Sequence, residues 1–97
     1  MSLKERYGNL TDEELMNRLE AGETEVTEYL LDKYKPLVKS RARTLYLIGG
    51  EKDDLIQEGM IGLFRAIRGF RSSEECSFYN FAELCITRQM YTAVQAS

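Results

Sequence analysis

Residues 53–70 read DDLIQEGMIGLFRAIRGF, and this stretch has the strongest helical pattern in the chain. On a helical wheel of about 100° per residue, one face collects the residues that predict a core-facing stripe: Leu55, Ile56, Gly59, Leu63, Ala66, Ile67 and Phe70. The opposite face mixes charged and amide side chains with three large apolar ones, Met60, Ile61 and Phe64. Apolar groups rimmed by charge are typical of a partner surface. A helix buried on nearly every side is the alternative interpretation.

Two glycines, Gly59 and Gly62, lie inside this predicted helix. Each costs about 1 kcal/mol in a helix relative to alanine. The cost is explained if these positions let a neighbouring backbone approach closely, so the glycines predict a tight contact with another element.

The segments before residue 53 also predict helices. Thr11 and Glu14 have the spacing of a capping box, and Gly22 is expected to end the short helix that follows. From Thr24 an apolar stripe continues to about residue 47, with Pro36 inside it. Because proline disfavours a helix interior, two interpretations remain open: one kinked helix over 24–47, or a new helix that begins at Pro36. Residues 1–9 are predicted to be a loose lead-in.

A last helix is predicted after the charged loop at 71–76, with Ser77 as its N-cap and an end near Gln95. No segment alternates with period two, so no sheet is expected. The prediction is therefore an all-α fold: a single domain over 1–97, built as a compact bundle of four or five helices.

Composition excludes several classes of protein. The chain of 97 residues has no apolar run near the roughly 20 residues that a membrane span needs and no secretion signal, so a cytoplasmic location is expected. Cys76 and Cys85 occur without histidine, and no metal site or cofactor is predicted. Residues 1–28 carry three basic and eight acidic side chains, whereas residues 33–47 carry five basic and no acidic ones. Such alternation favours separate surfaces for separate partners.

An enzymatic function is not supported. Asp54 and Glu58 are one helical turn apart and could in principle share a metal ion, which keeps a metal-dependent hydrolase as a minor alternative. The chain has neither a histidine partner nor a glycine-rich phosphate loop, and no catalytic residue is predicted.

The last predicted helix has two different faces. One face suits a core: Phe78, Ala82, Cys85, Ile86 and Ala93. The other combines an arginine, aromatic rings and amides that can contact phosphates and stack on bases: Asn80, Phe81, Leu84, Thr87, Arg88, Tyr91 and Gln95. An ordinary amphipathic helix is the alternative.

The stretch DDLIQEGMIGLFRAIRGF resembles region 2.2 of the sigma-70 family of bacterial RNA polymerase specificity factors. LTDEELMNRLEAGETEVTEYLLDKYKPLVKSRA resembles the leading helices and region 2.1, and SFYNFAELCITRQMYTAVQAS resembles region 2.3 running into 2.4. The segment GEKDDLIQEGMIGLFRAIR is most similar to the sigma-H type, an alternative factor of sporulation and stationary-phase transcription. The resemblance implies boundaries of 10–50 for the leading helices and region 2.1, 51–70 for region 2.2 and 71–97 for 2.3 and the start of 2.4. Nothing in the chain resembles the family's domain 4.

The resemblance implies a first partner, core RNA polymerase. In the family the region 2.2 helix docks on the clamp helices of the polymerase β′ subunit. The matching positions, together with Ile61 from the same face of the wheel, are Asp53, Asp54, Gln57, Glu58, Met60, Ile61 and Phe64. The resemblance also implies an anti-sigma factor as a further partner.

The resemblance implies a second partner, the non-template strand of the promoter −10 element, whose flipped bases region 2.3 captures on aromatic rings. The candidate positions are Phe78, Tyr79, Phe81, Leu84, Cys85, Arg88 and Tyr91. Leu84 and Cys85 stand where primary sigma factors carry a tryptophan pair. The resemblance therefore implies that these residues contribute less to separating the promoter strands. The expected function is promoter recognition and melting at the −10 element, and a helical protein–protein module without DNA binding is the alternative.

Overall fold

Five helices account for most of the computed structural model, which describes residues 1–71 and 76–96. In chain order they are α1 (Leu3–Tyr7), α2 (Asp12–Glu20), α3 (Glu25–Tyr46), α4 (Lys52–Gly69) and α5 (Phe78–Ala96). The described residues contain no strand. The predicted all-α fold is therefore confirmed.

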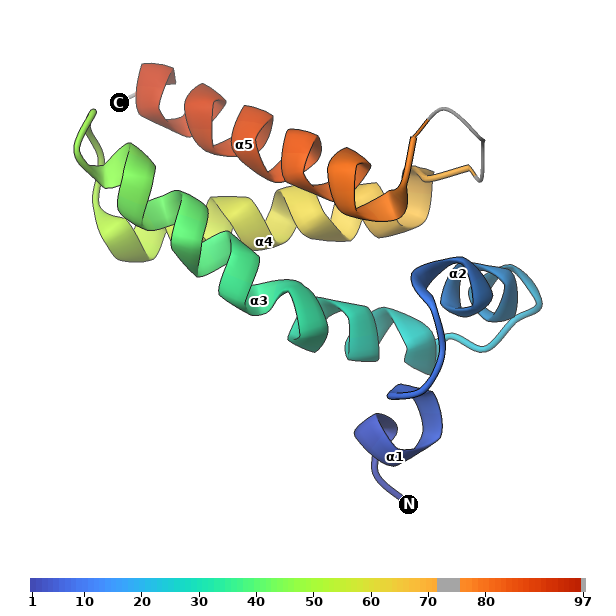
Figure 1. Cartoon of the computed structure of the whole chain (residues 1–97). Helices are drawn as coiled ribbons and strands as arrows, with labels where there is room; N and C mark the ends of the chain where they lie inside the picture. The colour runs from blue at the N-terminus through green and yellow to red at the C-terminus, as the bar shows by residue number, and fades with distance from the viewer. Residues whose placement is uncertain (72–75, 97) are drawn as a thin grey trace.

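The long helices α3, α4 and α5 form the body of the molecule, with α4 in the middle (Figure 1). Helix α4 runs antiparallel to both α3 and α5, while α1 and α2 lie around the first turns of α3 (Figure 1). The described residues extend over 39 × 31 × 18 Å. Since one helix with its side chains is about 10 Å thick, the short axis accommodates only two layers, and every helix keeps an exposed face.

All five helices contribute to one hydrophobic core. The wheel of residues 53–70 is right about Leu55, Leu63, Ala66, Ile67 and Phe70, which are buried, whereas Ile56 is half-buried. The core also contains Met90, which is fully buried and was absent from the predicted core face of the last helix.

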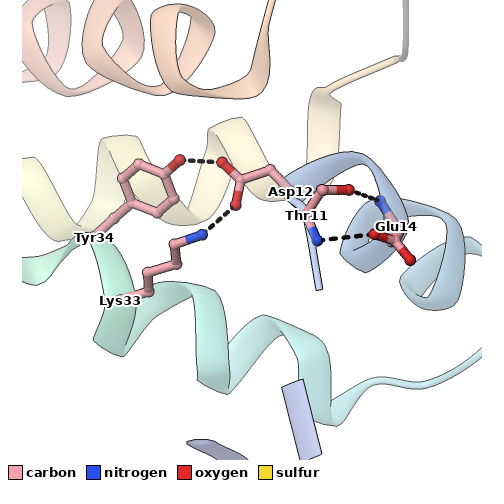
Figure 2. Close-up of polar contacts among 5 residues, drawn as sticks. All are labelled: Thr11, Asp12, Glu14, Lys33 and Tyr34. Atoms are coloured by element: carbon pink, nitrogen blue, oxygen red, sulfur yellow. Dashed lines mark hydrogen bonds and ion pairs between the residues drawn. The ribbon is translucent and has the colours of Figure 1, made fainter. Parts of the chain in front are cut away.

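The capping box predicted for α2 is present. The Thr11 backbone N–H donates to Glu14 Oε1 at 3.1 Å, and the Glu14 backbone N–H donates to Thr11 Oγ1 at 3.1 Å (Figure 2). These hydrogen bonds hold the pKa of Glu14 below its usual value. The adjacent Asp12 accepts hydrogen bonds from Lys33 Nζ at 2.6 Å and from the Tyr34 hydroxyl, which fastens α2 to α3 (Figure 2).

The predicted loose lead-in at residues 1–9 is wrong, because residues 3–7 form α1. Ser2 caps this helix by accepting a hydrogen bond from the Glu5 backbone N–H at 3.2 Å. Tyr7 is fully buried, its hydroxyl donates to Glu23 Oε2 at 3.0 Å, and its ring lies 5.7 Å from that of Tyr29. Burial, followed by the hydrogen bond to Glu23, raises the pKa of the Tyr7 hydroxyl. A helix of five residues is too short to show a periodic pattern, and tertiary packing of Tyr7 decides its position.

Pro36 lies within the uninterrupted helix α3, which settles the two open interpretations in favour of one helix. The proline removes the backbone donor for the carbonyl of Asp32. Pro36 and Asp32 are both exposed, so water can donate a hydrogen bond to the Asp32 carbonyl. The turn after α3 depends on Gly49 and Gly50, whose φ angles of 154° and 95° suit glycine.

The start of the last helix also agrees with the sequence analysis. Ser77 Oγ accepts a hydrogen bond from the Asn80 backbone N–H at 3.2 Å, as an N-cap does. Part of the predicted loop at 71–76 lies outside the described residues, which resume at Cys76. Over the described residues, none of the helices combines the length and the hydropathy that a membrane span requires.

Candidate functional site

The outer face of α4 carries the residues that the sequence assigned to polymerase. Asp53, Asp54 and Gln57 are exposed, as are Ile61 and Phe64. Glu58 and Met60 are half-buried at the two edges of the helix. The guanidinium of Arg68 covers the Phe64 ring at 5.6 Å from its centroid, which still leaves Phe64 40% exposed. The helix is therefore not buried on every side, and its solvent face combines carboxylates with apolar side chains.

A chain of hydrogen bonds joins this face to α5. Gln89 Nε2 donates to Glu58 Oε2 at 2.8 Å, and Gln89 Oε1 accepts from Arg65 Nη1 at 3.0 Å. The α5 amide thus bridges an acid and a base that lie on α4. This bridge orients the Glu58 carboxylate, and the adjacent Asp53 and Asp54 remain open to solvent.

The two glycines Gly59 and Gly62 of α4 allow close contacts with neighbouring helices. A Cβ atom at Gly62 would lie 2.7 Å from the backbone carbonyl oxygen of Cys85 and 3.0 Å from the Cβ of Gln89. At Gly59 it would lie 2.7 Å from Cγ1 of Val38 and 2.3 Å from Cε of Met90. The expectation that the glycines let a neighbouring backbone approach closely is confirmed at Gly62, which meets α5 backbone, whereas the nearest atoms at Gly59 belong to side chains.

A shallow groove of about 200 Å³ lies over this contact. It is lined by Arg65 of α4 and Arg88 of α5, and the other lining residues are Gly62, Cys85, Gln89 and Thr92. The sequence analysis did not predict this groove. The one signal that could have located it is Gly62, because close approach at that position brings the arginines of two different helices to the same edge.

The exposed face of α5 forms a stripe of Phe81, Leu84, Arg88 and Tyr91, which are three or four residues apart and share one side of the helix. Leu84 is 46% exposed and Tyr91 is 44% exposed. Phe81 is half-buried and its ring lies 5.5 Å from that of Phe70. The stripe can present an apolar surface, an aromatic ring and a guanidinium to one ligand strand.

Three of the candidate DNA residues lie elsewhere. Phe78 is only 2% exposed and packs edge-on against Phe70 and Tyr34 at 5.4 Å each. A buried ring offers no face to a base, so Phe78 is a core residue in this structure and does not belong to the candidate DNA surface. Its assignment came from the family resemblance, whereas the wheel placed it on the core side.

Tyr79 is exposed, but it lies two residues from Phe81 and therefore on the opposite side of α5, where its ring is 6.1 Å from Tyr34 of α3. Cys85 is half-buried between α4 and α5, and its burial raises the pKa of its thiol. A protonated thiol there acts as a small apolar group. Within the described residues, no three metal-ligating side chains gather to form a site.

Comparison with known proteins assigns the chain to a family. The family described as Sigma-70 region 2 matches residues 30–97. The RNA polymerase sigma-H factor of Bacillus licheniformis is 45% identical over 94 residues, which are 97% of this chain and 42% of that protein. The RNA polymerase sigma-H factor of Bacillus subtilis (strain 168) is 43% identical over 94 residues, with 97% and 43% covered.

The chain thus spans less than half the length of these curated relatives. No solved structure matches it significantly. The match covers α4 and α5 completely and most of α3, which are the helices that carry both candidate surfaces. By its region 2, the chain belongs to the sigma-70 family.

Proposed function

We propose that the chain acts as the region 2 domain of a sigma factor, which docks through α4 on the clamp helices of the polymerase β′ subunit and recognises the promoter −10 element through α5. The observation that carries this proposal is the outer face of α4, where carboxylates and apolar side chains are exposed together on one helix. The sigma-H relatives support assignment to an alternative sigma factor with a role in sporulation. The domain would work where the polymerase works, in the cytoplasm.

Docking would combine two kinds of contact. Asp53, Asp54 and Glu58 suit basic groups on the clamp helices, and Ile61 and Phe64 suit an apolar strip between them. The Gln89 amide holds the Glu58 carboxylate in place before the partner arrives, which reduces the entropy lost on binding.

Promoter opening would use the stripe on α5. Stacking a base on an aromatic side chain is worth about 1–3 kcal/mol, and the stripe contains the exposed ring of Tyr91. Arg88 and Arg65, which both line the groove, suit phosphates or base edges beside it. The domain forms and breaks no covalent bond in this function. Single-strand capture would supply part of the free energy of promoter opening, and polymerase would supply the rest.

The test of docking is the binding of the chain to core RNA polymerase without DNA, comparing the wild type with Glu58→Lys and Glu58→Gln. Glu58→Lys should weaken binding by about tenfold or more, since a like charge at a complementary interface is repulsive. Glu58→Gln keeps an oxygen acceptor for Gln89 and loses only the charge, so it should weaken binding less.

The matched control is Glu13→Lys, the same charge reversal on α2, where Glu13 is exposed. This variant should bind as the wild type does, and circular dichroism should show all variants folded. A folded wild-type chain that does not bind core polymerase would contradict the proposal.

A further inference from the structure

The Gln89 amide of α5 lies between two charged side chains of α4 that do not pair with each other. Glu58 and Arg65 are seven residues apart, or about 10 Å along the helix axis, and no ion pair joins them within residues 1–71 and 76–96. Gln89 Nε2 donates to Glu58 Oε2 at 2.8 Å, and Gln89 Oε1 accepts from Arg65 Nη1 at 3.0 Å. Both polar atoms of one amide are thus used in what is here called the Glu58–Gln89–Arg65 chain.

The position of Gln89 follows from the close approach of α5 to α4. Gly62 lies on the same face of α4 as Glu58 and Arg65, four residues after the first and three before the second. A Cβ atom at Gly62 would lie only 3.0 Å from the Cβ of Gln89. The glutamine side chain therefore begins beside the glycine, and from there its amide donor and its amide acceptor reach one charged neighbour each.

The two ends of the Glu58–Gln89–Arg65 chain belong to different candidate surfaces. Glu58 is a docking candidate on α4, and because its bond to Gln89 uses Oε2, the second carboxylate oxygen can accept from a partner's cation. Arg65 is exposed and lines the groove together with Arg88. Neither guanidinium has an ion-pair partner among the described residues. A cation at one end and a phosphate at the other would therefore act on the same amide.

Hydrogen bonds in such a chain strengthen one another, because each bond polarises the group that makes the next. The negative charge of Glu58 makes Gln89 Oε1 a stronger acceptor, which holds Arg65 against α5. A cationic group that binds Glu58 offsets part of this charge, and the bond between the amide and Arg65 weakens. The guanidinium is then free to turn toward a phosphate in the groove.

Resting on the proposed function, we infer that Gln89 is a positioning residue that couples the docking face of α4 to the groove beside the α5 stripe. Binding of a basic clamp residue to Glu58 releases Arg65 for the DNA backbone. Coupling between two binding sites is reciprocal, so a phosphate that takes Arg65 from Gln89 favours docking at Glu58 by the same factor. In this role Gln89 acts through its two neighbours and contacts neither partner.

The experiment measures the affinity of the 97-residue chain for core RNA polymerase with and without a single-stranded −10 non-template DNA oligonucleotide. The ratio of the two dissociation constants is the coupling factor. Gln89→Met keeps the length of the side chain and removes its amide. We expect this variant to lower the coupling factor about threefold, since cooperativity adds only a fraction to the strength of each hydrogen bond. Asn17→Leu, which removes an exposed amide from α2, is the matched control and should keep the wild-type factor.

A double-mutant cycle separates coupling through the chain from a merely structural role of Gln89. Glu58→Gln removes the charge that polarises the amide. This variant and Gln89→Met should therefore lower the coupling factor to the same value, alone or combined, because both interrupt one chain. A double variant in which the two losses multiply would show that the residues act independently, and would overturn the inference.

The remaining outcomes distinguish the inference from the proposed function. A Gln89→Met variant that is folded by circular dichroism and keeps the wild-type coupling factor would overturn the inference and leave the docking of α4 intact. If Gln89→Met does not fold, an unchanged factor in Glu58→Gln has the same meaning, because that variant tests the chain from its other end. A wild-type chain that binds polymerase equally with and without the strand would also overturn the inference alone. A wild-type chain that does not bind polymerase would remove both.

Discussion

Thr11 and Glu14 exchange two hydrogen bonds at the start of α2, and this pair shows how much one residue can contribute. Replacing Thr11 with alanine removes the side-chain acceptor for the Glu14 backbone N–H. We expect Thr11→Ala to lower the free energy of unfolding by about 1 kcal/mol, the usual cost of a lost N-cap. Urea denaturation near neutral pH measures this difference. An unchanged midpoint would mean that the Thr11 cap does not contribute to the stability of the chain.

The same hydrogen bonds predict a pH dependence. The pKa of Glu14 is lowered in the folded chain, mainly because its carboxylate accepts the Thr11 backbone N–H. Its contribution to stability is therefore present above the ordinary glutamate pKa of 4.5 and is lost as the pH falls below that value. A Glu14→Gln variant should lose less stability than the wild type between neutral pH and pH 3, as followed by urea denaturation at several pH values. Equal losses in both chains would contradict the prediction.

Phe78 and Phe81 show how little residue type alone predicts about where a side chain lies. Phe78 and Phe81 are the same residue type, three positions apart, and the family resemblance assigned both to DNA. Phe78 fills the core, whereas Phe81 stays at the surface with one edge against Phe70. The difference follows from which neighbours occupy the space around each ring, and residue type does not contain that information.

At the scale of elements, the contact between α4 and α5 depends on the missing side chain of Gly62. A Cβ atom there would press on the backbone carbonyl of Cys85, which cannot move without moving α5. We expect Gly62→Ala to destabilise the chain by about 1–3 kcal/mol, the usual cost of overpacking a core. The unfolding midpoint in urea measures the effect.

Gly69 is the matched control, since it lies in the same helix and a Cβ atom there meets nothing within 4 Å. Gly69→Ala should leave stability unchanged or raise it by up to about 1 kcal/mol, because alanine has the higher helix propensity. If the two variants were equally stable, the close approach at Gly62 would not limit the packing of α4 on α5.

At the scale of the whole molecule, the thin shape leaves separate faces for separate partners. The α4 face and the α5 stripe sit on neighbouring helices, and Gln89 connects them through Glu58 and Arg65. The proposed polymerase docking and the proposed DNA capture can thus occur together on one small domain, because neither surface covers the other.

This arrangement predicts different outcomes for two exposed tyrosines of α5. Tyr91 lies on the stripe with Arg88, and Tyr79 lies on the opposite side near α3. In a complex with core polymerase, Tyr91→Ala should weaken binding of single-stranded non-template −10 DNA by about 1–3 kcal/mol if one base stacks on this ring. Arg88→Ala should weaken it as well, and Tyr79→Ala should not.

Fluorescence anisotropy of the labelled DNA strand measures these affinities, with binding to polymerase itself as the control. If the Tyr91 and Arg88 variants bind polymerase and the strand as the wild type does, α5 does not read DNA. A protein-only interaction module would then be the better interpretation of this fold.

Much of the architecture could be predicted from local patterns. The capping box at Thr11, the N-cap at Ser77 and the stops at Gly22, Gly49 and Gly50 act over a few residues, and each has a recognisable signature. The 3.6-residue period located the core face of α4, because every long helix of a thin domain must bury one side. The outer face of α4, which was the first candidate site, followed directly from that pattern.

The sequence by itself therefore determined the helical segments after residue 10, most of their inward-facing residues and the resemblance to the family, since these depend on neighbours along the chain and on motifs. Only the tertiary structure decided that α1 forms around Tyr7, that α3 passes Pro36 without a break, and that Phe78 is buried while Phe81 is not. It also decided that Gln89 bridges Glu58 and Arg65, and that Lys39 and Arg43 of α3 line one groove with Asp53 of α4. The reason is physical: these features depend on distances between residues far apart in the chain, which packing alone sets.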